Sequence, residues 1–255
     1  MTERERFEIV VEEVGALIER VADLAEVVLI GGQVIAVERL AAGHDPVLQV
    51  ETDTGQVLTR GYSLAADLLV DPPYPEQSAR WDELPHLLRE CGFRRGPRDY
   101  QWDKEVRGEL VRLELFVPED APEPATAMTR LPGGDEVLTR ATPVMVGAGA
   151  RRSIKVPDPV SYLRLKLDAR LRLRDKPKDS FDLFAYARWK GPGVIRAALR
   201  SSQRRGELAA ELRELFGAIT APGVLDVLGY ATSLEGLERE LVAADVVRCF
   251  EEVVG

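Results

Sequence analysis

The pattern of hydrophobic and polar residues predicts strands alternating with helices in the first part of the chain and helices alone in the last. Residues 3–25 have apolar side chains at helical spacing with charged residues between them, which predicts an amphipathic helix. The β-branched run 27–30 ends in Gly31-Gly32 and leads into the apolar segment 33–41, a pattern typical of a strand, a tight turn and a helix. Such a turn directs backbone N–H groups and the positive end of the helix at a phosphate.

The residues that follow predict a mixed α/β domain and then a helical one. Asp53 and Gly55 supply turn chemistry between two strand-like runs, so we expect a β-hairpin over 47–60. An α/β (α+β) domain is expected over residues 1–156, and a C-terminal helical bundle over 157–255 that completes a cleft. The other predicted elements are strands at 65–70, 99–105, 109–117, 142–147 and 152–156, and helices at 76–91, 193–204, 206–217, 221–229 and 233–252.

The segment 162–173 carries two conflicting signals. Leucine alternates with other residues from Leu163 to Leu173, which is the period of a strand. The segment has no glycine or β-branched residue, however, and its Leu, Arg, Lys and Ala content has strong helix propensity. We therefore predict a helix with two apolar stripes, with Lys166 and Arg170 between them, where a cationic side chain could enter a cleft.

One row of side chains near the strand at 65–70 is suited to a metal-bound nucleotide. Residues i and i+2 of a strand point to the same face, about 6–7 Å apart, so Ser63, Ala65 and Asp67 form one row. A nucleoside triphosphate arrives with Mg²⁺, which prefers carboxylate and phosphate oxygens as ligands. The row has one carboxylate where two would be expected.

These residues give the chain a resemblance to the nucleotidyltransferase superfamily, in particular to the AbiEii-like toxin branch that includes the MenT toxins. That family has a glycine pair or Gly-Ser after its first strand, then an Asp-x-Asp pair on a neighbouring strand, often with a serine two residues upstream. Gly31 and Gly32 match the glycines, Ser63 matches the serine and Asp67 the second aspartate. Ala65 stands where the family has its first metal-binding aspartate.

The resemblance also implies a third carboxylate on a following strand. Alternation over 111–117 places Arg112, Glu114 and Phe116 on one face, and Glu114 is the match by order and parity. The family pattern then implies that Asp67 and Glu114 hold Mg²⁺. An exposed glutamate on an edge strand is an equally good interpretation of Glu114.

A second block of residues extends the resemblance over about 27–190. The family has a Lys-Leu-x-Ala helix and then Lys-Asp-x-x-Asp-Leu at the start of the next helix, which match residues 166–169 and 178–183 of this chain. The resemblance implies that Lys166 contacts the triphosphate and that Asp182 completes the active site. From the residues alone, Asp179 is equally suited to cap the helix near 180–190, with Asp182 as its third residue.

By this resemblance the chain is a Mg²⁺-dependent nucleotidyltransferase that moves a nucleotide from a nucleoside triphosphate to an acceptor, most simply RNA such as the 3′ end of transfer RNA. Gly31, Gly32 and Ser63 would contact the phosphates, and a cognate antitoxin protein is an expected partner. Because Ala65 removes a metal ligand, we expect weak transfer or none, whether the alanine is natural or engineered. The alternative is a non-catalytic protein that senses a nucleotide or binds a partner. A Rossmann-type protein is disfavoured because G-x-G-x-x-G does not occur.

Charge and composition set further limits. A net charge of −9 argues against a protein that coats nucleic acid with a broad basic surface. Residues 151–190 nevertheless hold twelve Lys/Arg against five Asp/Glu, which is typical of a solvated face and also of a basic wall facing triphosphate or RNA. Cys91 and Cys249 lack disulfide-framework and metal-ligand spacing. Without a long apolar run or a signal-peptide pattern, we expect a cytoplasmic protein that does not contact the membrane.

Overall fold

The computed structural model describes residues 1–71, 83–121, 128–147 and 151–255. These residues form two compact units. Unit 1 is Met1–Pro46 with Tyr62–Asp158, and unit 2 is Val47–Gly61 with Pro159–Gly255. The main segment of unit 2 thus begins close to the expected boundary at 157, but the hairpin expected in the first domain belongs to unit 2. The helix predicted over 76–91 is described only as α3 (Glu83–Glu90), and its first residues lie outside the described part.

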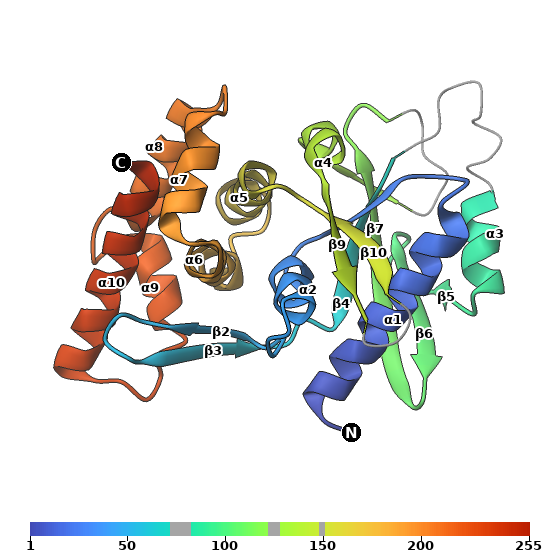
Figure 1. Ribbon diagram of the computed structural model, residues 1–255, viewed down its shortest axis with the longest axis horizontal. Coiled ribbons are helices and arrows are strands. Elements are labelled where there is room, and N and C mark those ends of the chain that lie inside the picture. The colour runs from blue at the N-terminus through green and yellow to red at the C-terminus, as the bar shows by residue number, and fades with distance from the viewer. Residues whose placement is uncertain (72–82, 122–127, 148–150) are drawn as a thin grey trace. The chain divides into compact units, whose positions relative to one another are not determined.

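Unit 1 is built on a mixed β-sheet (Figure 1). Its strand β1 (Val27–Ile30) pairs antiparallel with β4 (Ala65–Val70) and parallel with β10 (Arg152–Val156), while β4 pairs parallel with β7 (Glu109–Pro118). This confirms the expected α/β class with a mixed sheet flanked by helices. The order across the sheet is β5-β6-β7-β4-β1-β10-β9, with β5 at Arg94–Arg95, β6 at Gln101–Val106 and β9 at Thr142–Val146, and β8 (Thr129–Leu131) pairs with β7.

Helices cover this sheet because its strands present apolar side chains to them. All four residues of β1 are buried, so both faces of that strand are covered. The helix α1 (Glu3–Val21), which begins at a capping box of Thr2 and Glu5, contacts α3, β4, β7 and β10. The helix α2 (Gln33–Ala41) contacts β1, β4 and β9, and α4 (Gly134–Arg140) contacts β7. In β7 the expected alternation is confirmed, with Val111, Leu113, Leu115 and Val117 buried and the residues between them more exposed or at the strand end.

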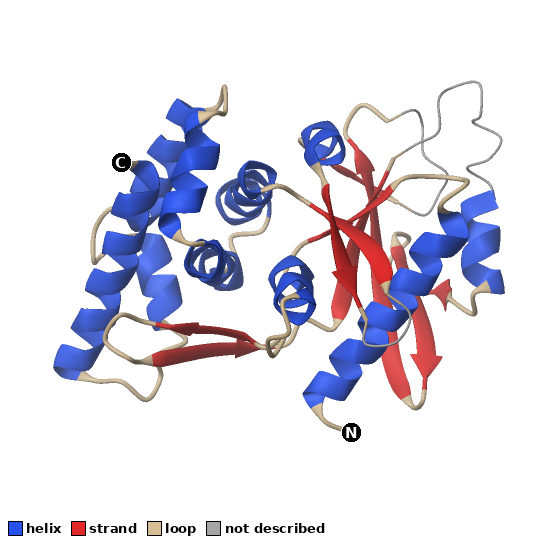
Figure 2. Ribbon diagram, viewed as in Figure 1, coloured by secondary structure: helices blue, strands red, loops and turns tan. Residues whose placement is uncertain are grey.

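Unit 2 consists of helices and one hairpin (Figure 2). Aromatic side chains form much of its core, and Phe216 stacks on Phe250 with ring centroids 3.8 Å apart. None of the helices in the described parts of the chain combines the length and apolar content needed to cross a membrane. The helices are α5 (Pro159–Asp168), α6 (Pro177–Lys190), α7 (Pro192–Arg200), α8 (Arg205–Phe216), α9 (Pro222–Leu228) and α10 (Gly236–Val254).

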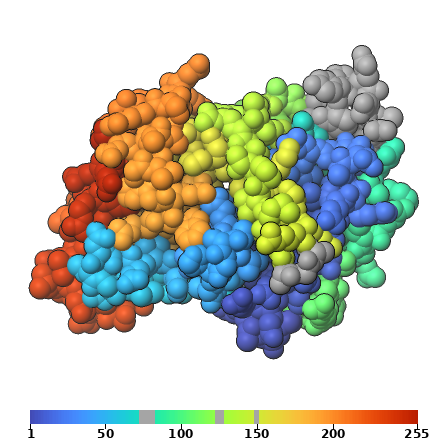
Figure 3. All heavy atoms as spheres, in the orientation of Figure 1, coloured from blue at the N-terminus to red at the C-terminus, as the bar shows by residue number. Residues whose placement is uncertain are grey.

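Buried charge holds the hairpin of β2 (Leu48–Glu51) and β3 (Val57–Gly61) to the helices of unit 2. The fully buried carboxylate of Asp245 accepts a hydrogen bond from the backbone N–H of Asp53 at 3.1 Å. Arg188 donates to the carboxylate of Asp53 at 2.7 Å, and Arg248 donates to both aspartates at 2.9 and 2.8 Å. In Figure 3 the pale blue atoms of the hairpin lie against the red-orange atoms of the C-terminal helices. These contacts explain why the hairpin belongs to unit 2.

The conflict over 162–173 is settled in favour of the helix. Residues 159–168 form α5, and Ala169–Leu173 continue it as one turn of π-helix. In the predicted stripe of Leu163, Leu167 and Leu171 the first two are buried and Leu171 is half-buried. In the second stripe, of Leu165, Ala169 and Leu173, Leu173 is 56% exposed. The expectation of two buried stripes is therefore wrong at the C-terminal end, where the wider π-turn alters the spacing of side chains.

Candidate functional site

The glycine turn of unit 1 lies against a carboxylate. Gly31 has a φ of +75°, which favours glycine. Gly32 is the N-cap of α2, so no N-cap side chain binds the first backbone N–H groups of the helix. A Cβ atom added at Gly31 would lie 2.9 Å from Cγ of Asp67, too close for any side chain. Glycine is therefore required here for two reasons, the backbone conformation and the close approach of Asp67.

Asp67 and Glu114 lie side by side on the sheet. The parallel pairing of β4 with β7 places Asp67 in register with Glu114 and Ala65 in register with Arg112. Residues in register point to the same face, so both carboxylates belong to one row of polar side chains. The side chains of Ala65, Asp67, Arg112 and Glu114 are each half-buried. The interpretation of Glu114 as an exposed glutamate on an edge strand does not hold, because β7 lies between β6 and β4.

Two buried glutamines support this row, and sequence reasoning missed both. Gln101 of β6 is in register with Glu114 and donates from Nε2 to Oε1 of Glu114 at 2.6 Å. Gln33, the first residue of α2, donates from Nε2 to the backbone carbonyl of Ser63 at 2.8 Å and is 1% exposed. The position of Gln33 directly after the glycines was a usable signal, whereas Gln101 depends on strand register.

The two carboxylates fit a single Mg²⁺ ion that arrives with a nucleotide. Mg²⁺ in nucleotide sites is commonly held by one or two carboxylates, with phosphates and water as its other ligands. Glu114 uses one oxygen for Gln101, which leaves the other for a metal. Within the described ranges no group of three or more His, Cys, Asp or Glu residues could hold a metal ion. The row therefore offers no obvious ligand set for a second ion.

In unit 2, Lys166 and Asp182 meet in a buried cluster of charges. Nζ of Lys166 donates to Oδ2 of Asp182 at 2.5 Å and to Oδ1 of Asp179 at 3.1 Å, and the lysine is only 2% exposed. Arg174 binds both oxygens of Asp179, at 2.7 and 2.9 Å, and Nε of Arg60 lies 2.9 Å from Oδ1 of Asp182. Three cations thus surround two buried carboxylates. The contact of Lys166 with a triphosphate stays a prediction.

The interpretation of Asp179 as a helix N-cap is wrong. The helix α6 begins at Pro177 with Lys176 as its N-cap, so Asp179 is the third helical residue and Asp182 lies in the second turn. Burial would raise the pKa of Asp179, but the nearby charges of Lys166 and Arg174 outweigh burial and the pKa is lowered. Asp179 is therefore ionised at neutral pH and contributes to the cluster as a charge.

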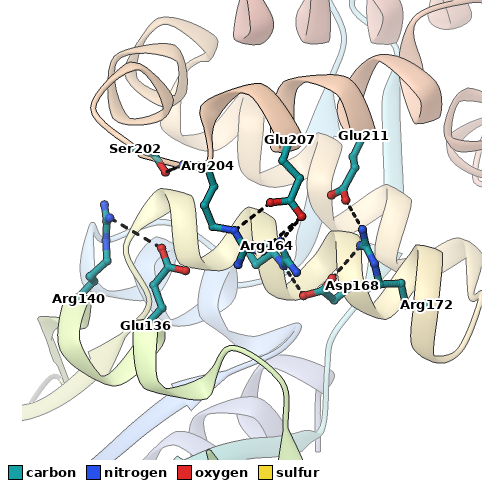
Figure 4. Close-up of polar contacts among 9 residues, drawn as sticks. All are labelled: Glu136, Arg140, Arg164, Asp168, Arg172, Ser202, Arg204, Glu207 and Glu211. Carbon is teal, nitrogen blue, oxygen red and sulfur yellow. Dashed lines mark hydrogen bonds and ion pairs between the residues drawn. The ribbon is translucent and has the colours of Figure 1, made fainter. Parts of the chain in front are cut away.

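The basic segment 151–190 does not form a bare basic wall. In α5 and the π-turn, Arg164 donates to Asp168 at 2.5 Å and to Glu207 of α8 at 2.9 Å (Figure 4). Arg172 donates to the other oxygen of Asp168 at 2.8 Å and also pairs with Glu211. Most other cations of the segment that the structure describes pair with carboxylates in the same way, including Arg152, Lys155, Lys166, Arg170, Arg174 and Arg188. The local positive charge is largely neutralised by acidic residues of the segment itself, such as Asp168 and Asp179, and by acidic residues from elsewhere in the chain, such as Glu207.

Comparison with known proteins supports the fold. No family model matches the sequence, and no curated protein matches it. Among solved structures, the chain is similar to an antigenic nucleotidyltransferase-like protein from Paracoccidioides brasiliensis. The TM-score is 0.50 and the identity 19%, over 89% of this chain and 93% of that one. This likeness shows a nucleotidyltransferase-like fold for this chain.

Proposed function

We propose that this chain binds a nucleoside triphosphate with Mg²⁺ at the Gly31 turn and the β4–β7 pair of unit 1, and that it belongs functionally to the nucleotidyltransferases. The observation that carries the proposal is the register of Asp67 with Glu114 beside that turn. Two carboxylates next to a glycine turn and a helix N-terminus suit a ligand that brings both phosphates and a divalent cation.

Each residue of the row has a role in this proposal. Asp67 and Glu114 hold one Mg²⁺, which when bound would offset the negative charge of the phosphates. The backbone N–H groups at the start of α2 bind phosphate oxygens. Gln101 orients Glu114, and Gln33 fixes the backbone of Ser63 next to the turn. The family resemblance implies that Lys166 contacts the triphosphate and that Asp182 completes the active site, and these two roles stay separate predictions.

Ala65 limits what the site can do. In register with Arg112 and two residues before Asp67, it lies where a further carboxylate would complete the row. Phosphoryl and nucleotidyl transfer depend mainly on positioning and on charge stabilisation. We therefore propose weak transfer to an RNA acceptor for the chain as it stands. The AbiEii-like branch, with its toxin activity and antitoxin partner, is a narrower form of this proposal.

The second candidate function is a non-catalytic nucleotide sensor. It is favoured by the lack of any three-carboxylate group in the residues that the structure describes. A sensor and a weak transferase share nucleotide binding and differ in turnover. The Ala65→Asp variant, which restores a carboxylate at position 65, therefore distinguishes the sensor from the weak transferase.

The experiment compares the natural chain with the Ala65→Asp, Asp67→Asn and Leu64→Asp variants. Binding of each labelled nucleoside triphosphate is measured with and without Mg²⁺, and transfer of label to total RNA is measured in parallel. We expect Mg²⁺-dependent binding by the natural chain, its loss in Asp67→Asn, and transfer about 100-fold faster in Ala65→Asp, the scale of one preorganised electrostatic group.

Leu64→Asp adds the same charge next to the row at an exposed residue of opposite parity, so it serves as the matched control. Measurable transfer at the same rate by the natural chain and Ala65→Asp would show that the row is wrongly assigned. Nucleotide binding without transfer in both would favour the sensor. Absence of nucleotide binding to the natural chain would reject both functions.

A further inference from the structure

One cluster of cations in unit 1 is not neutralised in the way that segment 151–190 is. Arg89 at the end of α3, Arg94 and Arg95 of β5, and Arg98 in the following turn lie within ten residues, and all four are exposed. We call these four residues the arginine edge, because β5 is the last strand of the sheet. A hollow of about 410 Å³ at this edge is lined by Arg89, Gly92, Phe93, Arg94 and Arg95.

Three of the four guanidinium groups lie over aromatic rings. Arg95 and Arg89 lie over the ring of the buried Trp102, at 5.4 and 6.0 Å from its centroid. Arg98 lies 5.9 Å from the ring centroid of Tyr100 and donates to its hydroxyl at 2.7 Å. A cation–π contact orients a guanidinium group without neutralising it, so Arg89 and Arg98 keep their positive charge for an anion.

Carboxylates are scarce at the arginine edge. Among the described residues, neither Arg89 nor Arg94 has a carboxylate oxygen within 4.0 Å. Glu90 instead lies 3.2 Å from His86 and 3.7 Å from Arg20. The highly exposed Asp99 approaches only Arg95, at 3.9 Å. The edge therefore keeps a net positive charge on a protein whose net charge is −9.

Strand register connects this edge to the carboxylate row. Arg94 is in register with Asp103 of β6, which is in register with Arg112 of β7, two residues before Glu114. Residues in register share a face, so Arg94 lies on the face of Glu114 and Asp67. Arg112 is about 10 Å from Arg94 across two strand spacings, and the two carboxylates lie farther along the same face. Between them, Asp103 binds Arg112 through two hydrogen bonds of 2.8 and 3.0 Å. Within the described part of the chain, Arg94 is thus the nearest guanidinium along this row without a carboxylate partner.

From this arrangement we propose that Arg94 and Arg98 of the arginine edge bind the phosphates of a single-stranded RNA segment whose end reaches the carboxylate row. Arg89 and Arg95 lie over Trp102, which is in register with Leu113 and so belongs to the opposite face of the sheet. The inference rests on the proposed function, because it assigns a binding surface to the acceptor. Arginine suits this task because its fork of N–H donors matches phosphate oxygens. A single strand with one end at Glu114 would cross β6 and meet Arg94 within a few nucleotides. The surface assigned to RNA is thus Arg94 with Arg98 and not the paired segment 151–190.

The test measures binding of a short fluorescein-labelled single-stranded RNA by anisotropy over a series of salt concentrations, without nucleotide. The variant Arg94→Gln/Arg98→Gln is compared with Arg196→Gln/Arg205→Gln, which makes the same change of charge on α7 and α8. We expect the first variant to weaken binding about tenfold and to flatten the slope of log affinity against log salt by about 1.4, since each phosphate contact on a single strand contributes about 0.7. The control variant is expected to match the natural chain.

Three results would overturn the inference. The first is that the natural chain does not bind the RNA. The second is equal binding and an equal salt slope for the natural chain and Arg94→Gln/Arg98→Gln. The third is unchanged RNA binding with self-association of that variant in sedimentation, which would assign the arginines to protection of an edge strand. Thermal unfolding of both variants shows that each is folded. Nucleotide binding by the natural chain is measured separately, so a failure of this inference is distinguishable from a failure of the proposed function.

Discussion

Asp67 of β4 lies directly opposite Glu114 of β7, and the carboxylate of Asp67 rests against the backbone of Gly31. The two carboxylates are 47 positions apart in the sequence and meet because β4 and β7 pair in parallel. Their closeness makes the site sensitive to any change in the turn. The first prediction uses that sensitivity.

We predict that Gly31→Ala abolishes Mg²⁺-dependent nucleotide binding, because its Cβ would displace the carboxylate of Asp67. The control is Gly43→Ala. Gly43 has a similar φ of +81°, but apart from its chain neighbours no atom of the described residues lies within 4 Å of the added Cβ. Both variants should lose about 1–2 kcal/mol of unfolding free energy from the left-handed backbone conformation. Isothermal titration with nucleotide and Mg²⁺ distinguishes them, and equal affinities would contradict the placement of Asp67 in the site.

The charge cluster of unit 2 predicts an order of stabilities. Asp179→Asn leaves Lys166, Arg174 and Arg60 around one carboxylate, Asp182, so we expect a loss of about 3–5 kcal/mol of unfolding free energy. Lys166→Met should cost less, because each buried aspartate then keeps one arginine. Urea unfolding at neutral pH measures both. A greater loss in Lys166→Met than in Asp179→Asn would mean that the lysine, and not the balance of charge, holds the cluster together.

The lowered pKa of Asp179 predicts how that loss depends on pH. Burial raises this pKa, but Lys166 and Arg174 lower it further, so the folded pKa is below the unfolded value of about 3.9. The stabilisation from the ionised carboxylate is then fully present above about pH 4 and is lost as pH falls through the folded pKa. The difference in unfolding free energy between the natural chain and Asp179→Asn should therefore be constant near neutral pH and shrink in acid. Urea unfolding at a series of pH values measures it, and a difference that grows in acid would reverse the sign of the shift.

The anchor of the hairpin can be tested without reference to any ligand. In Asp245→Asn, the backbone N–H of Asp53 and the side chain of Arg248 lose a charged acceptor, so we expect a loss of about 1–3 kcal/mol and faster amide exchange in β2 and β3. Asp226→Asn is the matched control. Asp226 accepts from Arg170 and Ser180 within unit 2, and neither of these two partners belongs to the hairpin. If hydrogen exchange of the hairpin rises equally in both variants, Asp245 is not its anchor.

Local patterns were enough to predict much of unit 1. The β-branched run before Gly31 predicted β1 and the turn, and the alternation around Glu114 predicted which face of β7 is buried, because both signals depend only on neighbours in sequence. The helical propensity of 162–173 likewise outweighed its alternation. These predictions succeeded because backbone preference and side-chain period act over a few residues.

Other features depended on distant parts of the chain. The sequence could not show that Gln101 would support Glu114, because that contact needs the register of β6 on β7. It also could not show that the hairpin at Asp53 would join the helices, because the buried Asp245 that binds it lies 192 residues later. The charge of 151–190 was misleading for the same reason, since acids such as Glu207 and Glu211 neutralise its arginines across helices.

The sequence by itself predicted the glycine turn and the candidate carboxylates, because residue identity and local spacing carry that information, and the family resemblance implied the missing carboxylate at Ala65. Only the tertiary structure decided that Asp67 faces Glu114, that Lys166 is enclosed by two aspartates, and that Arg94 keeps its charge on the same face as the carboxylates. The physical reason is that the strength of a charge in a protein depends on its neighbours in space and on its burial, and a linear sequence specifies neither.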